Sequence, residues 1–302
     1  MIDARVVVEG LRFPEGPIVL ADGSLLVCEM ATGRLAVIDP QGGIERIEVG
    51  GGPNGAAVGP DGAVYVCNNG GWPMHDYGSL LVPADVNQDD RYIGGSIQRV
   101  DLATGAVETI YDGLRSPNDI VFDADGGFWF TDYGKQRETD EDRGVVCYGR
   151  PDGAELRRVV APLVRPNGIA LSPDGATLYV AETPTGRLWR WTVTGPGEVE
   201  TALPHPHGGS LVAGLDGHQF FDSLAVEAGG NVCIATIYNV GITVVSPAGE
   251  VEHMPLPGEF YDPVPTNIAF GGDDMRTAYI TLSATGRVMA CRWPRPGLRL
   301  KY

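Results

Sequence analysis

Short apolar runs separated by glycine-rich turns recur along the whole chain. In one copy of the pattern, Pro53-Asn54-Gly55 precedes an Asp-Gly turn and the β-rich run Val64-Tyr65-Val66. Asp-Gly between two apolar runs is a hairpin signal, because glycine accepts the positive φ that tight turns need. Another β-rich run follows in each copy, and no stretch shows the 3.6-residue periodicity of a helix. The pattern therefore predicts short antiparallel strands throughout.

Each copy of the repeat carries one acidic or amide residue ahead of its Asp-Gly turn, which we call the anchor. The six anchors are Glu15, Asn54, Asn118, Asn167, Asp222 and Asn267. They are 39, 64, 49, 55 and 45 residues apart, which matches the period of a four-stranded propeller blade. We therefore predict an all-β fold: a six-bladed β-propeller with about four antiparallel strands per blade, forming one domain over residues 1–302. The run Arg5-Val6-Val7-Val8 is expected to pair with the last blade and close the ring.

Three connections are longer than the repeat requires. The longest, at about residues 70–95, contains aromatic and polar side chains, and we predict that it is a lid over the channel mouth. Trp72 and His75 are its candidate substrate-binding residues, and the alternative interpretation is a solvated connection. The other two excursions cover residues 133–143, which are strongly charged, and 203–221, which include His205-Pro206-His207.

The charge balance narrows the possible partners. The chain has 22 Lys and Arg against 39 Asp and Glu, a net charge of −17, which disfavours nucleic acid and anionic membrane surfaces. Five widely spaced cysteines without a CxxC motif are expected to be reduced thiols. No signal peptide or transmembrane run is recognisable, so we expect a cytoplasmic protein, a monomer or small homo-oligomer, that acts on a small molecule.

The anchors carry the candidate chemistry. We expect each anchor to precede the first strand of its blade, and because that strand lines the central channel, all six anchors should point oxygen-bearing side chains at the axis. Carboxylate and amide oxygens suit a hard cation such as calcium. Glu15 and Asp222 would repel each other without a cation, so we predict a metal there. The alternative, that an amide only hydrogen-bonds neighbouring backbone, is preferred for Asn54 and Asn267.

Four motifs resemble those of the SMP-30/gluconolactonase/luciferin-regenerating-enzyme family of six-bladed propellers. They are Phe13-Pro14-Glu15-Gly16-Pro17, Ser116-Pro117-Asn118-Asp119, Trp129-Phe130-Thr131-Asp132-Tyr133-Gly134 and Arg165-Pro166-Asn167-Gly168-Ile169. The resemblance spans essentially the whole chain. Members of this family bind one divalent cation in the channel, and most of them hydrolyse sugar lactones.

Carried over motif by motif, the resemblance implies that Glu15, Asn167 and Asp222 are metal ligands. It implies that Asn118 is a further ligand or a substrate-positioning residue, and that Asp222 is also the catalytic carboxylate. The chain departs from the family twice. Phe221-Asp222-Ser223 replaces the commoner Pro-Asp-Gly, and Arg115 is only an approximate counterpart of the family's substrate-binding arginine, one residue out of alignment.

The sequence therefore predicts a divalent-metal-dependent hydrolase that opens a small, sugar-derived lactone. The metal would polarise the carbonyl and Asp222 would act as general base, with Asp119 and Asp132 as supporting residues. Turn and strand-end chemistry is an equal alternative for Asp132. Calcium is the expected cation, and zinc, magnesium, manganese and iron(II) are the alternatives.

Two rival functions use the same site. The first is hydrolysis of an organophosphate or aryl ester, because P=O and C=O groups make similar demands on a metal. The second is a non-catalytic, metal-binding propeller. The chain contains neither Gly-x-Ser-x-Gly nor His-Glu-x-x-His, so a serine-hydrolase or zinc-protease mechanism has no support.

Overall fold

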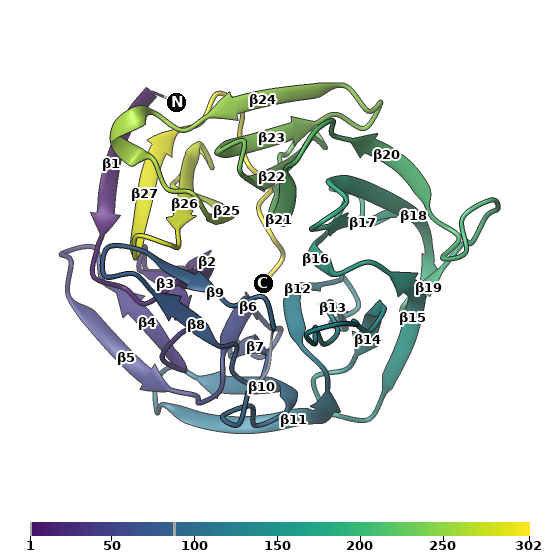
Figure 1. Ribbon diagram of the computed structural model, residues 1–302, viewed down its shortest axis with the longest axis horizontal. Helices are drawn as coiled ribbons and strands as arrows, with labels where there is room; N and C mark the ends of the chain where they lie inside the picture. Colours follow the sequence, from purple (N-terminus) through teal and green to yellow (C-terminus); the bar gives the residue numbers. More distant parts are fainter. Residues whose placement is uncertain (1, 87–88) are drawn as a thin grey trace.

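The computed structural model describes residues 2–86 and 89–302, and antiparallel strands dominate it. Within these residues, six sheets are arranged around a common axis (Figure 1). The predicted six-bladed β-propeller is therefore confirmed. Residues 87 and 88, which fall inside the predicted lid, lie outside the described residues.

The strands of the first three blades, each from the axis outward, are as follows. Blade 1 contains β2 (Pro14–Val19), β3 (Leu25–Glu29), β4 (Arg34–Ile38) and β5 (Ile44–Glu48). Blade 2 contains β6 (Pro53–Val58), β7 (Val64–Asn68), β10 (Gly95–Asp101) and β11 (Ala106–Leu114). Blade 3 contains β12 (Pro117–Phe122), β13 (Phe128–Asp132), β14 (Gly144–Gly149) and β15 (Leu156–Leu163).

The other three blades repeat this order with two variations. Blade 4 contains β16 (Pro166–Leu171), β17 (Thr177–Glu182), β18 (Arg187–Gly195) and β20 (Ser210–Gly214), with the short β19 (Glu198–Val199) also paired to β18. Blade 5 contains β21 (Phe220–Val226), β22 (Val232–Ile237), β23 (Gly241–Val245) and β24 (Val251–Pro255). Blade 6 contains β25 (Pro265–Gly271), β26 (Thr277–Leu282), β27 (Arg287–Arg292) and β1 (Ile2–Val8). A 3₁₀ turn, η1 (Gly258–Phe260), precedes blade 6.

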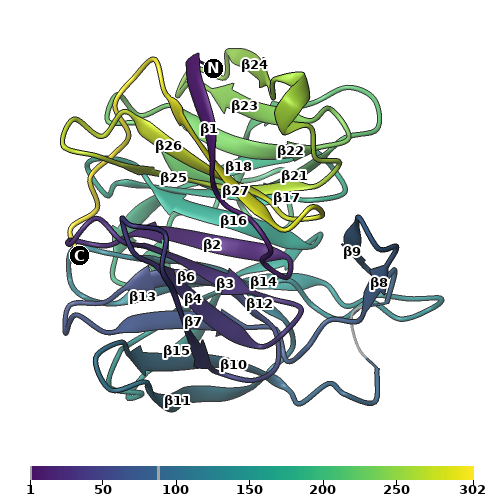
Figure 2. The same ribbon diagram turned by 90° about the vertical axis from the view of Figure 1, so that its left-hand side faces the viewer.

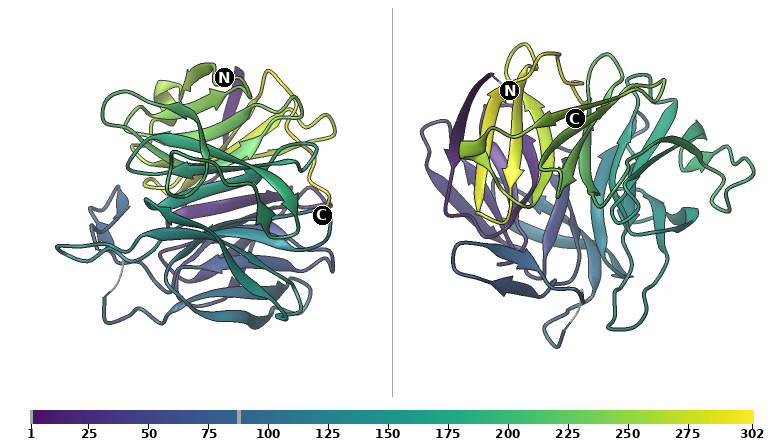
Figure 3. Two further views of the ribbon diagram at one scale, coloured as in Figure 1. Left: turned by 90° about the vertical axis from the view of Figure 1, so that its right-hand side faces the viewer. Right: turned by 45° about the horizontal axis from the view of Figure 1, so that its top comes forward.

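The two ends of the chain close the ring in blade 6. The N-terminal strand β1 pairs antiparallel with β27, so that Arg5 faces Ala290 and Val6 faces Met289 (Figure 3). This pairing confirms the predicted closure. It covers the outer edge of β27, which would otherwise present unpaired backbone groups.

The anchors differ in one respect from the prediction. They lie inside the innermost strand of each blade, near its start, and not before it; Asn54, for example, is the second residue of β6. A proline next to the anchor begins the strand in four blades, where its missing N–H costs no ladder hydrogen bond. In β6 the pairing register shifts between Pro53 and Ala56, a stretch that includes the anchor Asn54, so the strand bulges at the anchor.

Glycines beside the anchors let neighbouring innermost strands approach closely. A Cβ added at Gly55 would lie 2.6 Å from the backbone oxygen of Asn118, and one at Gly168 would lie 2.8 Å from that of Asp222. Both distances are shorter than side chains tolerate. Glycine after the anchor therefore brings the anchors of adjacent blades together at the axis.

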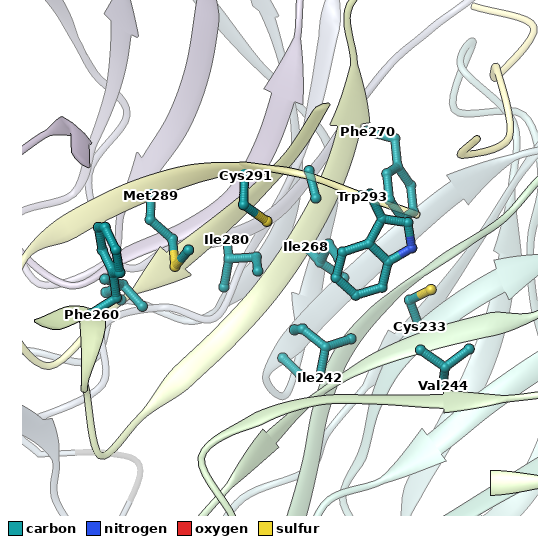
Figure 4. Packing of buried hydrophobic residues seen from close by; sticks show 13 residues of the cluster. Cys233, Ile242, Val244, Phe260, Ile268, Phe270, Ile280, Met289, Cys291 and Trp293 are labelled. Atoms are coloured by element: carbon teal, nitrogen blue, oxygen red, sulfur yellow. The ribbon is translucent and has the colours of Figure 1, made fainter. Parts of the chain in front are cut away.

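The hydrophobic core lies between the blades. At the junction of blades 5 and 6, Trp293 packs among Cys233, Ile242, Ile268 and Phe270, all of them buried (Figure 4). Cys28 and Cys67 occupy equivalent buried positions in blades 1 and 2. All five cysteines are free thiols.

The predicted lid contains a two-stranded hairpin, β8 (Met74–Asp76) and β9 (Leu81–Pro83). The excursion over residues 203–221 was predicted as a loop, but it supplies β20, the outermost strand of blade 4. The apolar run Leu211-Val212-Ala213 explains this difference, since it completes the sheet against β18. No helix among the described residues is long and apolar enough to cross a membrane.

The C-terminal segment crosses the end of the propeller opposite the hairpin. Leu298 N donates a hydrogen bond to Val226 O (2.8 Å) on blade 5, and the Tyr302 ring meets Phe122 of blade 3 (centroids 6.0 Å apart). Figure 2 shows the C-terminus at one end and the β8–β9 hairpin at the other.

Glu227 joins this segment to blade 5, and it provides a test of the fold. Its buried carboxylate accepts hydrogen bonds from Trp293 Nε1 (2.7 Å), Arg295 Nε (2.7 Å) and Asn231 Nδ2 (2.8 Å). Glu227→Ala should lower the free energy of unfolding in urea by about 3–5 kcal/mol, because it leaves buried donors without a partner. Glu252, which is exposed and pairs with the same arginine at 3.3 Å, is the control: Glu252→Ala should cost less than about 1 kcal/mol. Equal losses in the two variants would contradict this account.

Candidate active site

The anchors and the predicted lid lie at the same end of the propeller. Because β7 runs antiparallel to β6, its last residue, Asn68, pairs with Pro53, the neighbour of Asn54. The insertion leaves β7 at this point. The same geometry places the connection after β13, which begins at Tyr133, at the anchor end of blade 3. We call this end of the molecule the anchor end.

Three carboxylates are buried at the axis. Glu15, Asp119 and Asp222 are 3%, 7% and 8% exposed, and in the described ranges no ion pair reaches any of them. Burial, together with the Asp222 carboxylate, raises the pKa of Glu15 well above its ordinary value. Burial likewise raises the pKa values of Asp119 and Asp222 to about 7. The site therefore gathers three carboxyl groups that no Lys or Arg of the described residues pairs with, and bringing all three to the ionised form is costly.

Asp222 and Asn167 are held by one hydrogen-bond network. Ser223 N donates to Asp222 Oδ1 (3.0 Å), and Ser223 Oγ donates to Asn167 Oδ1 (3.2 Å). Asn167 Nδ2 donates in turn to Thr183 Oγ1 (3.1 Å). Ser223, the departure from the commoner glycine, thus connects the anchors of blades 4 and 5, and β21 keeps the register that the repeat predicts.

The remaining amide anchors fall into two groups. Asn118 Oδ1 and Asn54 Oδ1 are buried and have no hydrogen-bond partner among the described residues. Asn54 Nδ2 donates to Met30 Sδ (3.6 Å), a side-chain atom, so the backbone role preferred above for Asn54 is wrong. Asn267 Oδ1 instead accepts from the backbone N–H of Ile268 (2.8 Å), as expected for an anchor that only organises backbone. An unpaired buried amide oxygen is costly, and it is the kind of donor that a cation or a substrate hydroxyl would satisfy.

Asp119 and Asp132, the two predicted supporting residues, have different surroundings. Asp119 accepts from its neighbour Ile120 N (2.9 Å) and from Ile169 N (3.4 Å), so it bridges the innermost strands of blades 3 and 4. Asp132 accepts from the backbone N–H groups of Ser116 (2.7 Å) and Arg115 (3.0 Å). This is the strand-end chemistry given above as the alternative for Asp132.

Tyr133 belongs to the site, although no role follows for it from the sequence pattern. It is buried, and burial raises the pKa of its hydroxyl; Asp222 adds to the rise, while Arg165 and Thr183 act in the opposite direction. Its ring lies edge-on to Trp72, with centroids 5.4 Å apart. The only sequence feature that points to a role for Tyr133 is its position inside one of the motifs that resemble the family.

The predicted substrate-binding residues are not all brought to the axis. Trp72 contacts the Tyr133 ring at the edge of the site, and its Nε1 donates to Ala84 O (3.1 Å) within the insertion. The guanidinium of Arg115 lies at the anchor end but faces Asp142, 3.4 Å away. His75 is exposed on β8, where its ring approaches Tyr77 (6.2 Å).

The oxygen donors at the axis can be compared with the ligands that the predicted cation needs. In residues 2–86 and 89–302, no three His, Cys, Asp or Glu side chains form a metal-binding group. A cation at the axis would therefore need amide oxygens beside the carboxylates. The unpaired oxygen of Asn118 and the two carboxylates Glu15 and Asp222 meet this need, and their oxygens suit a hard divalent ion.

The fold and this site define a class: a six-bladed propeller with a buried carboxylate and amide site on its innermost strands. Residues 13–284 match the family model described as "SMP-30/Gluconolactonase/LRE-like region", and the chain belongs to this family. "Lactonase drp35" from Staphylococcus saprophyticus is 31% identical over 251 residues, which are 80% of this chain and 68% of that protein.

Solved structures have the same fold. A gluconolactonase from Xanthomonas campestris superposes with a TM-score of 0.72 at 24% identity, covering 96% of this chain and 89% of its own. Regucalcin from Agrobacterium tumefaciens, described as a calcium-binding protein, superposes with a TM-score of 0.74 at 18% identity, covering 99% and 98%.

Charge repulsion at the axis predicts an unusual stability effect. After removal of divalent cations with a chelator, Glu15→Gln should raise the free energy of unfolding at pH 8 by about 1–4 kcal/mol, because it removes an uncompensated buried charge. Asp132→Asn is the matched control and should be destabilising, since its carboxylate accepts backbone hydrogen bonds. If Glu15→Gln destabilised the metal-free protein, as Asp132→Asn is expected to, this would contradict the repulsion between the buried carboxylates. Urea unfolding monitored by circular dichroism measures both.

Proposed function

We propose that this protein is a divalent-cation-dependent lactonase that hydrolyses a small, uncharged, sugar-derived lactone at the anchor end. The observation that carries the proposal is the burial of Glu15 and Asp222 among amide anchors, with no ion pair to either carboxylate from the residues that the structure describes. Membership of the SMP-30/gluconolactonase family and the lactonase relative support the reaction class. The net charge of −17 favours an uncharged substrate over a phosphorylated one.

The cation would be held by Glu15, Asn167 and Asp222, with Asn118 as a further ligand. Their oxygen donors favour calcium, and magnesium, manganese, zinc and iron(II) are the alternatives. When bound, the cation supplies Lewis-acid polarisation of the lactone carbonyl.

Asp222 is the general base in this proposal. Its carboxylate accepts a proton from the attacking water while the water oxygen bonds to the carbonyl carbon. The bond from that carbon to the ring oxygen then breaks, and Asp222 returns the proton to the oxygen that leaves as an alcohol. The N–H of Ser223 orients the carboxylate through its hydrogen bond to Oδ1.

In this proposal, residues at the rim of the anchor end select the substrate. Trp72 and Tyr133 present aromatic rings beside the buried site, and Asn118 orients the substrate from within it. His75 and Arg115 are the polar candidates, although Arg115 must release Asp142 to reach a ligand. The C-terminal segment crosses the opposite end, so substrate and product exchange at the anchor end.

A pH-drop screen of aldonolactones tests the proposal directly. The protein is stripped of metal and assayed, and then assayed again with calcium, magnesium, manganese, zinc or iron(II) restored. Hydrolysis that appears only with a restored cation is the expected result. Turnover confined to aryl esters or organophosphates would favour the first rival function. Inactivity across every panel, with metal bound, would favour the non-catalytic propeller.

The ligand assignment predicts which anchors control metal affinity. Glu15→Gln and Asp222→Asn should each weaken calcium binding by roughly tenfold or more, about 1.4 kcal/mol, because each removes one of two anionic ligands. Asn267→Ala is the control and should leave the affinity largely unchanged, because its amide oxygen already accepts a backbone hydrogen bond. Isothermal calorimetry on the folded variants measures this. Wild-type affinity in both carboxylate variants would refute the assignment.

The lid assignment predicts a separate effect on specificity. Replacing residues 72–92 with a short Gly-Ser turn should raise KM and reorder the ranking of lactones, with metal affinity unchanged, because the anchors are left in place. The deletion also uncovers Phe13 and Met30, which pack against Leu81, so thermal melting must first show that the variant is folded. Unchanged kinetics and ranking in the folded variant would rule out a lid.

A further inference from the structure

Three aromatic side chains cluster at the anchor end of blade 5, apart from the anchors themselves. His218 lies in the connection before β21, Phe220 begins β21, and Tyr238 directly follows β22. The ring centroids of His218 and Tyr238 are 4.5 Å apart, and those of Phe220 and Tyr238 are 5.0 Å apart. We call these three residues the blade 5 platform.

The core of the fold does not account for the platform. Tyr238 is 57% exposed, and its backbone has a φ of +71°. A bulky residue in this region of φ is an outlier that costs energy, and such residues persist where the surroundings or a function require them. An exposed ring contributes little to burial, so stability does not explain why a tyrosine occupies this strained position.

The platform lies next to the reacting carboxylate of the proposed site. Phe220 precedes Asp222 by two residues on β21, which separates their Cα atoms by about 7 Å along the strand. The platform therefore begins two residues from the carboxylate that is proposed to act on the lactone.

The hydrogen bond and the ion pair that tie the described part of the lid to the propeller lie away from this side of the rim. The hairpin of the lid leans over blades 1 and 6, where Leu81 N donates to Ala284 O (2.8 Å) and Asp76 pairs with Arg12 (2.8 Å). Neither contact involves blade 5. A substrate whose lactone ring sits below the lid is therefore free of these contacts on the side of blade 5, where the platform lies.

We propose that the blade 5 platform is a binding subsite for a second sugar ring, so that the substrates include lactones of disaccharide acids. This inference rests on the proposed lactonase function. Tyrosine and histidine combine an apolar face with a polar tip, which suits a ring that has C–H faces and a rim of hydroxyls. The exposed Asp216 and Asn239 stand near His218 and Tyr238 in the chain and offer partners for those hydroxyls.

Kinetics on a matched pair of substrates test the subsite. Tyr238→Asn removes the ring but keeps a residue that tolerates positive φ. It should lower the ratio of kcat/KM for cellobionolactone to that for gluconolactone by about three- to tenfold, the value of a ring stack. Tyr238→Phe, which keeps the ring, should preserve the ratio, as should Val251→Ser on the exposed outer strand of the same blade. An unchanged ratio in Tyr238→Asn overturns the inference.

A binding measurement separates this inference from the proposed reaction. Saturation-transfer NMR with cellobiose and the calcium-loaded protein needs no turnover. Transfer to the non-reducing ring in the wild type and in Val251→Ser, reduced in Tyr238→Asn, supports the platform even if no lactone is hydrolysed. Absence of that transfer in the wild type overturns the platform even if gluconolactone is a substrate.

Discussion

Glu15 and Asp222 place two like charges at the propeller axis, where burial removes the water that would otherwise stabilise them. Ion pairs with Lys or Arg are absent for both in the part of the chain that the structure describes. A carboxylate in this position is either protonated or balanced by a cation. The fold creates this constraint, because each blade contributes one anchor to the axis and the glycines beside the anchors let the strands that carry them approach.

In the proposed function, the innermost strands at the axis and the connections at the rim have different roles. The anchors lie near the starts of the innermost strands. There the strand pairs with its neighbour at the start and bulges around the anchor, which fixes the direction of the anchor side chain. The rim is made of connections, and it contains both the predicted lid and the proposed blade 5 platform. In the proposed function, chemistry that needs accuracy is therefore placed on strands, whereas substrate selection is placed on segments that can change without disturbing the ring.

Much of this arrangement could be predicted from the sequence, because it repeats. Six anchors, each about one blade length from the next, predict six blades, and the run Arg5-Val6-Val7-Val8 predicts the closing strand, which the structure confirms in β1. The repeat could not reveal β20, since its apolar residues lie in a stretch rich in glycine and histidine. Nor could it place Tyr133, Ser223 or the platform, because their roles depend on contacts between blades that no local pattern encodes.

The central claim is that a divalent cation neutralises the carboxylates at the axis. Crystals grown with manganese as a stand-in for the native ion, and measured at an X-ray energy where manganese scatters anomalously, test it most directly. The account predicts one anomalous peak on the axis, within bonding distance of Glu15, Asn167 and Asp222. A peak elsewhere, or an axis with no peak in crystals whose protein binds manganese in solution, would contradict it.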